Sequence, residues 1–516
     1  MVRTFARLAV AAVVLGVACQ GTTPPPTSTP TQVVRPESAS PSPSPSAKVP
    51  LGGTLRVALS AAIGSLDPQI ADTNPLVVSQ IFEGLVARGP NGVVPALATK
   101  WLVGADGRGW TFTLRDGVTF HDGTPLDAAA VAKSLTRVND PLIEKADAPD
   151  GRTVVLTTRV PYGPFLSALA TPPYFVVSPV SRTSGTGPFR APVGAEGARP
   201  LVLERNDRYW RSDATGQKLP YLDKLSFTAV ADSGTRLASI RAGNVDYVQD
   251  LALGDINTIR TDPSLQLVTR PGTMVLYLGI NLSQTPLDDL RVRQALAQSL
   301  NPRTLADRLY AGTASAASQL PPPAMLGYDD SLMEFAKTDT AAAKKLLADS
   351  GHASLEVDLW YLQGGDPSLP DMRKVAETVG VDLAAGGFTV DPKTIDPVTF
   401  GVNLRENRYP LWVGLAPAPT FDPDEIFGAF IPPVVNGQDQ PTEAGAWVNK
   451  EVAGLLRKAR SEPDQSKRSE LYKQVSKIVQ REIPRIPLAW SAPPAAATKK
   501  VIGPAAALFA EVAMGK

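Results

Sequence analysis

The sequence predicts an α/β fold, in which helices pack against strands through both halves of the chain. Residues 52–60 (GGTLRVALS) mix β-branched and small residues after a Gly-Gly pair, as a buried first strand does. The pattern Thr-Pro-Leu-Asp occurs at 124–127 and again at 285–288, and apolar residues follow each copy at helical spacing. These three observations place strands and helices in alternation.

The remaining elements follow in order along the chain. Residues 110–123 contain two Asp-Gly pairs around Val118 and Phe120, which predicts a short β-meander with tight turns. Asn301-Pro302 predicts another helix start. Apolar stripes predict helices at about 450–459 and 465–481, and the alternating residues at 486–490 then predict a returning strand.

Composition excludes several functional classes. The 516 residues carry 51 basic and 50 acidic side chains, a balance that argues against a nucleic acid partner. Only two histidines and one cysteine are present, so a zinc site has almost no ligands and no internal disulfide can form. No Gly-x-Ser-x-Gly or His-Glu-x-x-His motif occurs, so the chain is expected to bind and not to catalyse, without a cofactor.

The N-terminus predicts export. Arg3 and Arg7 precede an apolar stretch at 8–17, shorter than the roughly 20 residues that a membrane-spanning helix needs. The residues Gly16-Val17-Ala18-Cys19 resemble the lipobox of bacterial lipoproteins, although Gly16 stands where Leu is usual. The resemblance implies lipidation of Cys19; the alternative is an ordinary signal peptide with an incidental cysteine.

A tether follows this signal. Residues 22–46 contain 8 Pro and 11 Ser or Thr, which leaves too little apolar surface to offset the entropy of ordering. We therefore divide this part of the chain into a signal peptide at 1–19 and a disordered tether at 20–49. About 465 residues remain, which favours two or three domains.

An ordered series of motifs in these residues resembles the family 5 extracytoplasmic solute-binding proteins, the oligopeptide, dipeptide and nickel-binding class that serves ABC importers. The order of eight motifs, more than any one of them, carries the resemblance. They are GGTLRVALS (52–60), SLDP (65–68), IFEGLV (81–86), PALATKW (95–101), WTFTLRDGVTFHDGTPLDAAAVAKSL (110–135), TGPF (186–189), LERNDRYW (203–210) and INLSQTPLDDLRVRQALAQSLN (280–301).

The resemblance implies a two-lobed clamshell of the periplasmic-binding-protein type, with an inserted α+β domain. Lobe I would comprise residues 50–85, 185–275 and 488–516, with the inserted domain at 86–184, and lobe II residues 276–487. Two strands near 270–280 and 480–490 would form the hinge, and closure would bury a solute between the lobes. The implied partners are a small solute, an ABC permease and, through the lipid anchor, the outer face of the cytoplasmic membrane, with a monomeric chain.

The resemblance also points to residues for solute binding. Peptide-binding members carry Trp-x-x-Asp, in which the aspartate pairs with the peptide's α-ammonium, but here Trp412 is followed by Leu415 in the place of the acid. A buried ammonium without such a partner is costly. Asp422 or Asp424 is a candidate replacement, and the alternative for both is a structural turn.

Four other residues are candidates for the cleft wall. Trp412 and Trp490 offer area and one donor each, with core packing as an equal alternative. Tyr277 and Asn281 lie beside the predicted crossing strand. The sequence thus predicts a tethered receptor for a small, peptide-like solute, and leaves open a non-peptide solute, a secreted hydrolase on the same anchor, or a receptor that signals or chaperones without transport.

Overall fold

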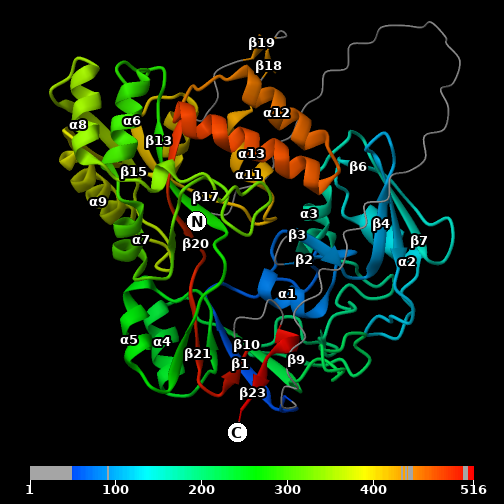
Figure 1. Ribbon diagram of the computed structural model, residues 1–516. Coiled ribbons are helices and arrows are strands. Elements are labelled where there is room, and N and C mark those ends of the chain that lie inside the picture. The colour runs from blue at the N-terminus through cyan, green and yellow to red at the C-terminus, as the bar shows by residue number, and fades with distance from the viewer. Residues whose placement is uncertain are drawn as a thin grey trace, which may run out of the picture.

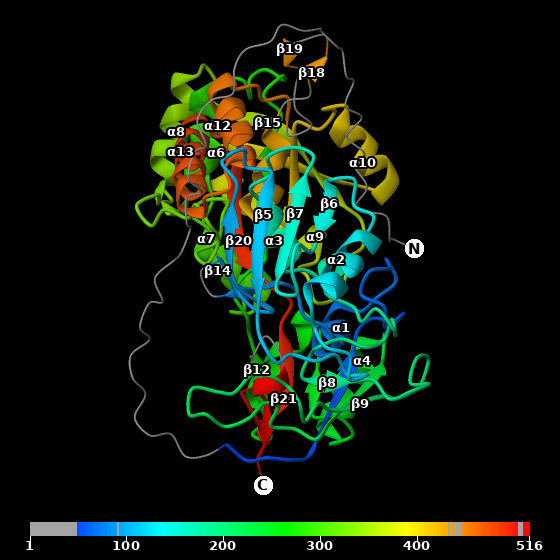
Figure 2. The ribbon, with the colours of Figure 1, turned by 90° about the vertical axis from the view of Figure 1, so that its right-hand side faces the viewer.

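The computed structural model describes residues 49–89, 92–431, 434–435, 438–439, 445–503 and 509–515 (Figure 1). The predicted signal peptide, Cys19 and almost all of the tether lie outside these residues. Figures 1 and 2 show three main sheets, with the seven-stranded sheet at the bottom, the six-stranded sheet at the upper left of Figure 1 and the four-stranded sheet at its right.

The seven-stranded sheet is built around the predicted first strand. Its order is β12 (Leu265–Val268), β21 (Ala495–Thr498), β11 (Tyr247–Val248), β1 (Thr54–Leu59), β10 (Lys224–Ala229), β9 (Leu201–Arg205) and β8 (Phe189–Arg190). Strand β1 is parallel to both β10 and β11, and Leu55, Val57 and Leu59 are fully buried against α1 (Pro75–Ile81). Helices α4 (Ser233–Arg241) and α5 (Ile256–Thr261) pack on the opposite face.

The four-stranded sheet is antiparallel throughout. Its order is β4 (Ala98–Val103), β5 (Gly109–Leu114), β7 (Thr153–Thr158) and β6 (Ile143–Asp147), and it packs with α2 (Ala128–Arg137) and α3 (Phe165–Leu169). The hairpin of β2 (Val86–Gly89) and β3 (Gly92–Pro95) leads into it. The predicted strand at 118–120 is absent, because that segment makes only an isolated bridge between Thr119 and Pro125.

Two predicted helix starts were misplaced by a few residues. Helix α2 begins at Ala128 and not at Pro125, because Asp127 provides the cap by accepting a hydrogen bond from the backbone N–H of Ala130. Likewise, α6 (Leu290–Ser299) is capped by Asp289 and not by Thr285. The predicted start at Asn301-Pro302 is confirmed in α7 (Pro302–Tyr310).

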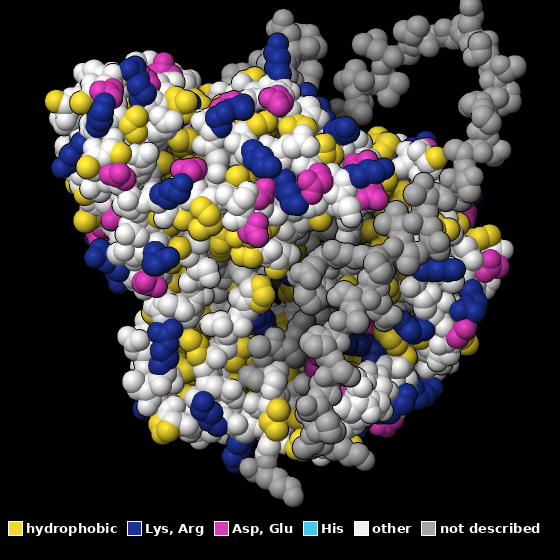
Figure 3. Space-filling view, viewed as in Figure 1, with side chains coloured by type: hydrophobic (Ala, Val, Ile, Leu, Met, Phe, Trp, Pro, Cys, Tyr) yellow, Lys and Arg dark blue, Asp and Glu magenta, His cyan; other side chains and the backbone are white. Residues whose placement is uncertain are grey.

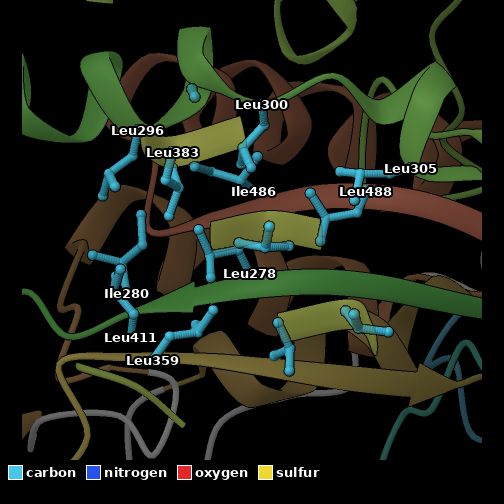
Figure 4. Close-up of a cluster of buried hydrophobic side chains, with 14 of the residues drawn as sticks. Leu278, Ile280, Leu296, Leu300, Leu305, Leu359, Leu383, Leu411, Ile486 and Leu488 are labelled. Atoms are coloured by element: carbon cyan, nitrogen blue, oxygen red, sulfur yellow. The ribbon is translucent and has the colours of Figure 1, made fainter. Parts of the chain in front are cut away.

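The six-stranded sheet forms the second lobe. Its order is β14 (Ser315–Ala316), β20 (Arg485–Ser491), β13 (Met274–Ile280), β17 (Leu411–Pro417), β15 (Leu355–Leu362) and β16 (Phe388–Ile395). One face packs against α6, α7, α8 (Thr340–Asp349) and α9 (Met372–Ala385), and Figure 4 shows the leucine and isoleucine side chains of this core. The other face carries α10 (Pro397–Arg405), α11 (Pro423–Phe427), α12 (Lys450–Ser461) and α13 (Gln465–Glu482).

Short strand pairs complete the described elements: β18 (Val434–Val435) with β19 (Gln438–Asp439), and β22 (Val501–Ile502) with β23 (Ala513–Met514). The predicted helices at 450–459 and 465–481 and the strand at 486–490 are confirmed as α12, α13 and β20. Among the described residues, no helix is both long and apolar enough to cross a membrane.

Two connections join the lobes, at 269–273 and at 492–494. They run side by side, because Met274 pairs with Ser491 and the Thr273 N–H donates to the Ser491 carbonyl at 2.9 Å. Strands β13 and β20 therefore belong to the six-stranded sheet, and residues 488–491, which the sequence assigned to lobe I, lie in it too. The two-lobed α/β architecture is confirmed; the detailed division into domains otherwise stays a prediction.

Candidate interlobe binding cleft

The two lobes approach each other on either side of a hollow. Figure 3 shows the surface hollowed near its centre, with basic and acidic side chains interspersed around it. On the side of the two connections, the Leu253 N–H of lobe I donates to the Pro367 carbonyl of lobe II at 3.0 Å. Arg270, just after β12, donates to the Tyr247 hydroxyl at 2.8 Å. We call this side the strand crossing.

A second set of contacts joins the lobes on the side of the four-stranded sheet. The segment before α3 docks on the turn between α12 and α13, where the Gly163 N–H donates to the Arg460 carbonyl at 2.7 Å. A Cβ added at Gly163 would lie 2.1 Å from the Glu462 carbonyl oxygen, so only glycine allows this approach. We call these contacts, together with those of Ser167 below, the α3 contact.

An open cavity of about 410 Å³ lies beside the α3 contact, between residues 103–107 of the β4–β5 turn and residues 458–467. None of the six predicted ligand-binding residues lines this cavity. It is therefore separate from the cleft wall that the sequence analysis predicted.

Asp422 lies at the centre of the α3 contact. Its carboxylate accepts two hydrogen bonds from the Arg468 guanidinium, at 2.7 and 2.9 Å, and a third from the Ser167 hydroxyl of lobe I at 2.9 Å. The Asp422 and Arg468 side chains are only 2% and 1% exposed. Burial alone would raise the pKa of Asp422, but the Arg468 guanidinium beside it holds that pKa below its ordinary value.

The neighbouring carboxylate is also neutralised. Asp424 accepts from the Arg460 guanidinium at 3.0 and 3.1 Å, and Asp422 additionally caps α11 through the Asp424 N–H. Both acids that the sequence offered as replacements for the missing aspartate thus have arginine partners. Asp422 as a ligand-binding residue stays a prediction, and the structure gives its carboxylate a joining role between the lobes.

The Trp412–Leu415 segment forms strand β17, whose alternation places these two side chains on opposite faces. Trp412 is buried in an aromatic cluster with Tyr277 and Tyr409, and its ring covers Gly279 on the adjacent strand. Leu415 stands opposite Leu276 and packs against the core on the α6–α9 side. In this structure both residues serve packing; their roles in solute binding stay predictions.

The other three predicted residues are also engaged within the protein. The Trp490 indole N–H donates to the Gln319 carbonyl at 3.0 Å. The Arg485 guanidinium lies 4.1 Å above the Tyr277 ring, and Asn281 is fully buried with its side-chain oxygen accepting from Ser283. Their contacts with a solute stay predictions as well.

The structure brings together two charged residues that sequence reasoning missed. Glu425 on α11 and Arg88 on β2 come from opposite lobes, both side chains are exposed, and each acts electrostatically on the other. Crowding by protein atoms raises the pKa of Glu425 to about 7 and lowers that of Arg88. No sequence signal connects the two, because they lie far apart in the chain.

The described residues offer no group of three or more His, Cys, Asp or Glu side chains that could hold a metal ion. Among the described residues, the His121 ring bonds to backbone groups: it accepts from the Gly185 N–H and lies 2.9 Å from the Gly187 carbonyl. Burial lowers the pKa of His121 to about 4, which keeps the ring neutral at pH 7. This histidine stabilises a turn.

Two α/β lobes joined by paired connections define a binding protein of the clamshell class. The family model for the middle part of the bacterial extracellular solute-binding proteins, family 5, matches residues 92–437. The chain therefore belongs to this family, as the motif series predicted.

Relatives cover most of the chain. The dipeptide-binding protein of Escherichia coli is 28% identical over 455 residues, which span 78% of this chain and 82% of that protein. Heme-binding protein A of Haemophilus influenzae is 27% identical, over 80% of this chain and 82% of that protein. The structure of HbpA2 from Haemophilus parasuis superposes with a TM-score of 0.78 at 25% identity, over 90% of this chain and 100% of that one.

Proposed function

We propose that this protein captures a small, peptide-like solute between its two lobes and delivers it unchanged to an ABC import permease. The observation that carries this proposal is the paired connection at 269–273 and 492–494. In the described part of the chain, these are the only covalent links between the seven-stranded and the six-stranded sheets. Such a pair allows one lobe to rotate against the other as a rigid body. Membership of family 5 agrees with this use of the architecture.

The names of relatives support a peptide-like solute. They include the dipeptide-binding protein of Escherichia coli and the glutathione-binding protein GsiB of the same species, which is 26% identical over 84% of this chain. A heme-binding relative of similar identity favours a non-peptide solute as the alternative. Because Leu415 stands in the place of the acid, peptide-like and non-peptide solutes both stay open as alternatives.

The proposal includes the location of the protein. Cys19 would carry the lipid anchor, and the Pro/Ser/Thr tether at 20–49 would hold the monomeric lobes away from the outer face of the cytoplasmic membrane. Stable anchoring needs more than one acyl chain, since each buried CH₂ contributes only about 0.8 kcal/mol. Mass spectrometry of the mature N-terminus tests this part, with a diacylated cysteine as the expected result.

Native mass spectrometry of the purified protein tests the function itself. We expect a co-purified small molecule at one per chain, which denaturation releases intact and whose identification as a peptide supports the peptide-like class. A released porphyrin or sugar would contradict that class and keep the receptor function. Turnover of the molecule into a chemically altered product would instead support the rival hydrolase.

A further inference from the structure

Beside the strand crossing, each lobe contributes one aspartate to the interface. Asp250 follows β11 in lobe I, and Asp366 lies between β15 and α9 in lobe II. Their two segments touch, because the Leu253 N–H donates to the Pro367 carbonyl at 3.0 Å. Asp366 directly precedes Pro367, and Asp250 stands just before Leu253 in the same segment. Two groups of like charge therefore meet where the lobes join.

The backbone fixes Asp250 at this place. The Gln249 N–H donates to the Ala58 carbonyl of β1 at 3.0 Å, and the Leu251 N–H donates to the Pro494 carbonyl, in one of the two connections, at 2.8 Å. Between them Asp250 has a φ of 50°, in the left-handed region that few residues other than Gly, Asn and Asp adopt. Such a conformation persists where the surrounding structure determines it, here between the lobe I sheet and a connection.

The Asp250 carboxylate forms no ion pair with any described residue. It accepts a hydrogen bond from the Ser60 hydroxyl at the end of β1. Two arginines act on it electrostatically, but each donates to another group. Arg236 of α4 donates to the Asp250 backbone carbonyl at 2.8 Å, and Arg270 donates to the Tyr247 hydroxyl at 2.8 Å. The carboxylate thus lies at the interface without a cation of its own.

The pKa of Asp250 depends on the position of lobe II. Burial and the charge of Asp366 raise it, whereas the Ser60 hydroxyl and the two arginines lower it. Ser60 and Arg236 belong to lobe I and move with Asp250, so a lobe rotation changes mainly the burial and the repulsion by Asp366. When lobe II moves away at this point, the pKa of Asp250 falls towards the ordinary aspartate value. The arrangement that binds the proton more tightly gains population as the pH falls.

We propose that Asp250 and Asp366 form a pH-sensitive switch at the strand crossing. A proton on Asp250 favours the lobe arrangement of this structure, and loss of that proton favours a wider separation of the Asp250 and Asp366 segments. The inference rests on the lobe rotation of the proposed function and adds its regulation by the pH outside the cytoplasm.

Pulsed electron spin resonance on the full mature chain tests the switch without added solute. Cys19→Ser leaves no native thiol, and Asn244→Cys in lobe I and Lys374→Cys in lobe II, both at exposed positions, carry two spin labels. The interlobe distance of this structure should gain population as the pH falls from about 8 to 4. The expected gain is about tenfold for each unit by which the pKa of Asp250 differs between the two arrangements.

Three variants separate the switch from other effects of pH. Asp250→Asn tolerates the left-handed backbone and still accepts from Ser60 but cannot titrate, so it should hold the arrangement of this structure at every pH. Asp366→Asn removes the repulsion, so its transition should move to lower pH. Asp382→Asn is the matched control, because burial also raises the pKa of Asp382, yet this carboxylate accepts from the Asn301 N–H within lobe II. It should respond as the wild type does.

Three outcomes would overturn the switch and leave the receptor function standing: a distance distribution that is the same at every pH, a gain of this arrangement as the pH rises, or a pH response that survives Asp250→Asn. The receptor function fails separately, if native mass spectrometry finds no bound small molecule or a chemically altered product.

Discussion

The strand crossing and the α3 contact join the same two lobes by different means. At the crossing, the two connections run side by side through the Thr273–Ser491 backbone hydrogen bond, and the Leu253 N–H of lobe I donates to the Pro367 carbonyl of lobe II. At the α3 contact, by comparison, a buried carboxylate, its arginine and a serine hydroxyl from the other lobe meet. Backbone pairing tolerates many side chains, whereas a buried charge requires its partners.

This difference predicts how strongly single substitutions weaken each of these two joints, the strand crossing and the α3 contact. A backbone ladder loses little when a side chain changes, provided that the strand geometry remains. A buried ion pair broken on one side leaves an uncompensated charge, which typically costs 3–5 kcal/mol. The α3 contact should therefore be the more sensitive of the two joints to single substitutions.

The largest effect is expected for Arg468→Ala. It leaves the Asp422 carboxylate buried without its cation, so the free energy of unfolding should fall by about 3–5 kcal/mol. Urea denaturation measures this, with Lys467→Ala, an exposed neighbour on the same helix, as the control. Asp422→Asn combined with Arg468→Met should recover part of the loss, because no buried charge is then left unpaired. A cost below about 1 kcal/mol for Arg468→Ala, the range of exposed pairs, would show that the buried Asp422–Arg468 pair does not stabilise the fold.

The stabilising contribution of the Asp422–Arg468 pair should be lost in acid. The pKa of Asp422 is lower in the folded protein than in the unfolded chain, so the unfolded chain binds the proton more readily. The stabilising contribution is therefore complete above the ordinary aspartate pKa of about 3.9 and is lost as the pH falls through the lower folded value. The stability gap between wild type and Asp422→Asn should stay constant from about pH 8 to 5 and narrow below about pH 4. Urea midpoints of both proteins measure this gap at each pH. If the gap already narrows between pH 7 and 5, the pKa of Asp422 is raised in the folded protein instead.

The two joints also differ in how far the sequence could predict them. The crossing was expected within a few residues, because β20 has a clear alternating pattern and the motif series implied two linking strands. The α3 contact was not expected. Asp422 bonds to Ser167 across 255 residues, and no local pattern encodes such a pairing.

Local patterns failed where two nearby residues competed for one role. Thr124 and Asp127 can each cap a helix, and in the structure Asp127 caps α2. The orientation of Leu415 is, in contrast, encoded locally: in a strand, a residue three positions after Trp412 must point to the other face. The two-residue period of the strand therefore suffices to separate Leu415 from the face that carries Trp412.

Gly163→Ala should lower the stability by less than Arg468→Ala. It separates the two sides of the α3 contact sterically and changes no charge. The added methyl group meets the Glu462 carbonyl oxygen at 2.1 Å, so backbone must shift, at a cost of typically 1–3 kcal/mol. Gly151→Ala, where the added Cβ has nothing within 4 Å, is the matched control in the same part of the chain. Hydrogen exchange should show faster exchange of the Gly163 region in the first variant only, with protection at β13 and β20 unchanged. If β13 and β20 lose protection equally, the two joints open as one unit and the distinction between them does not hold.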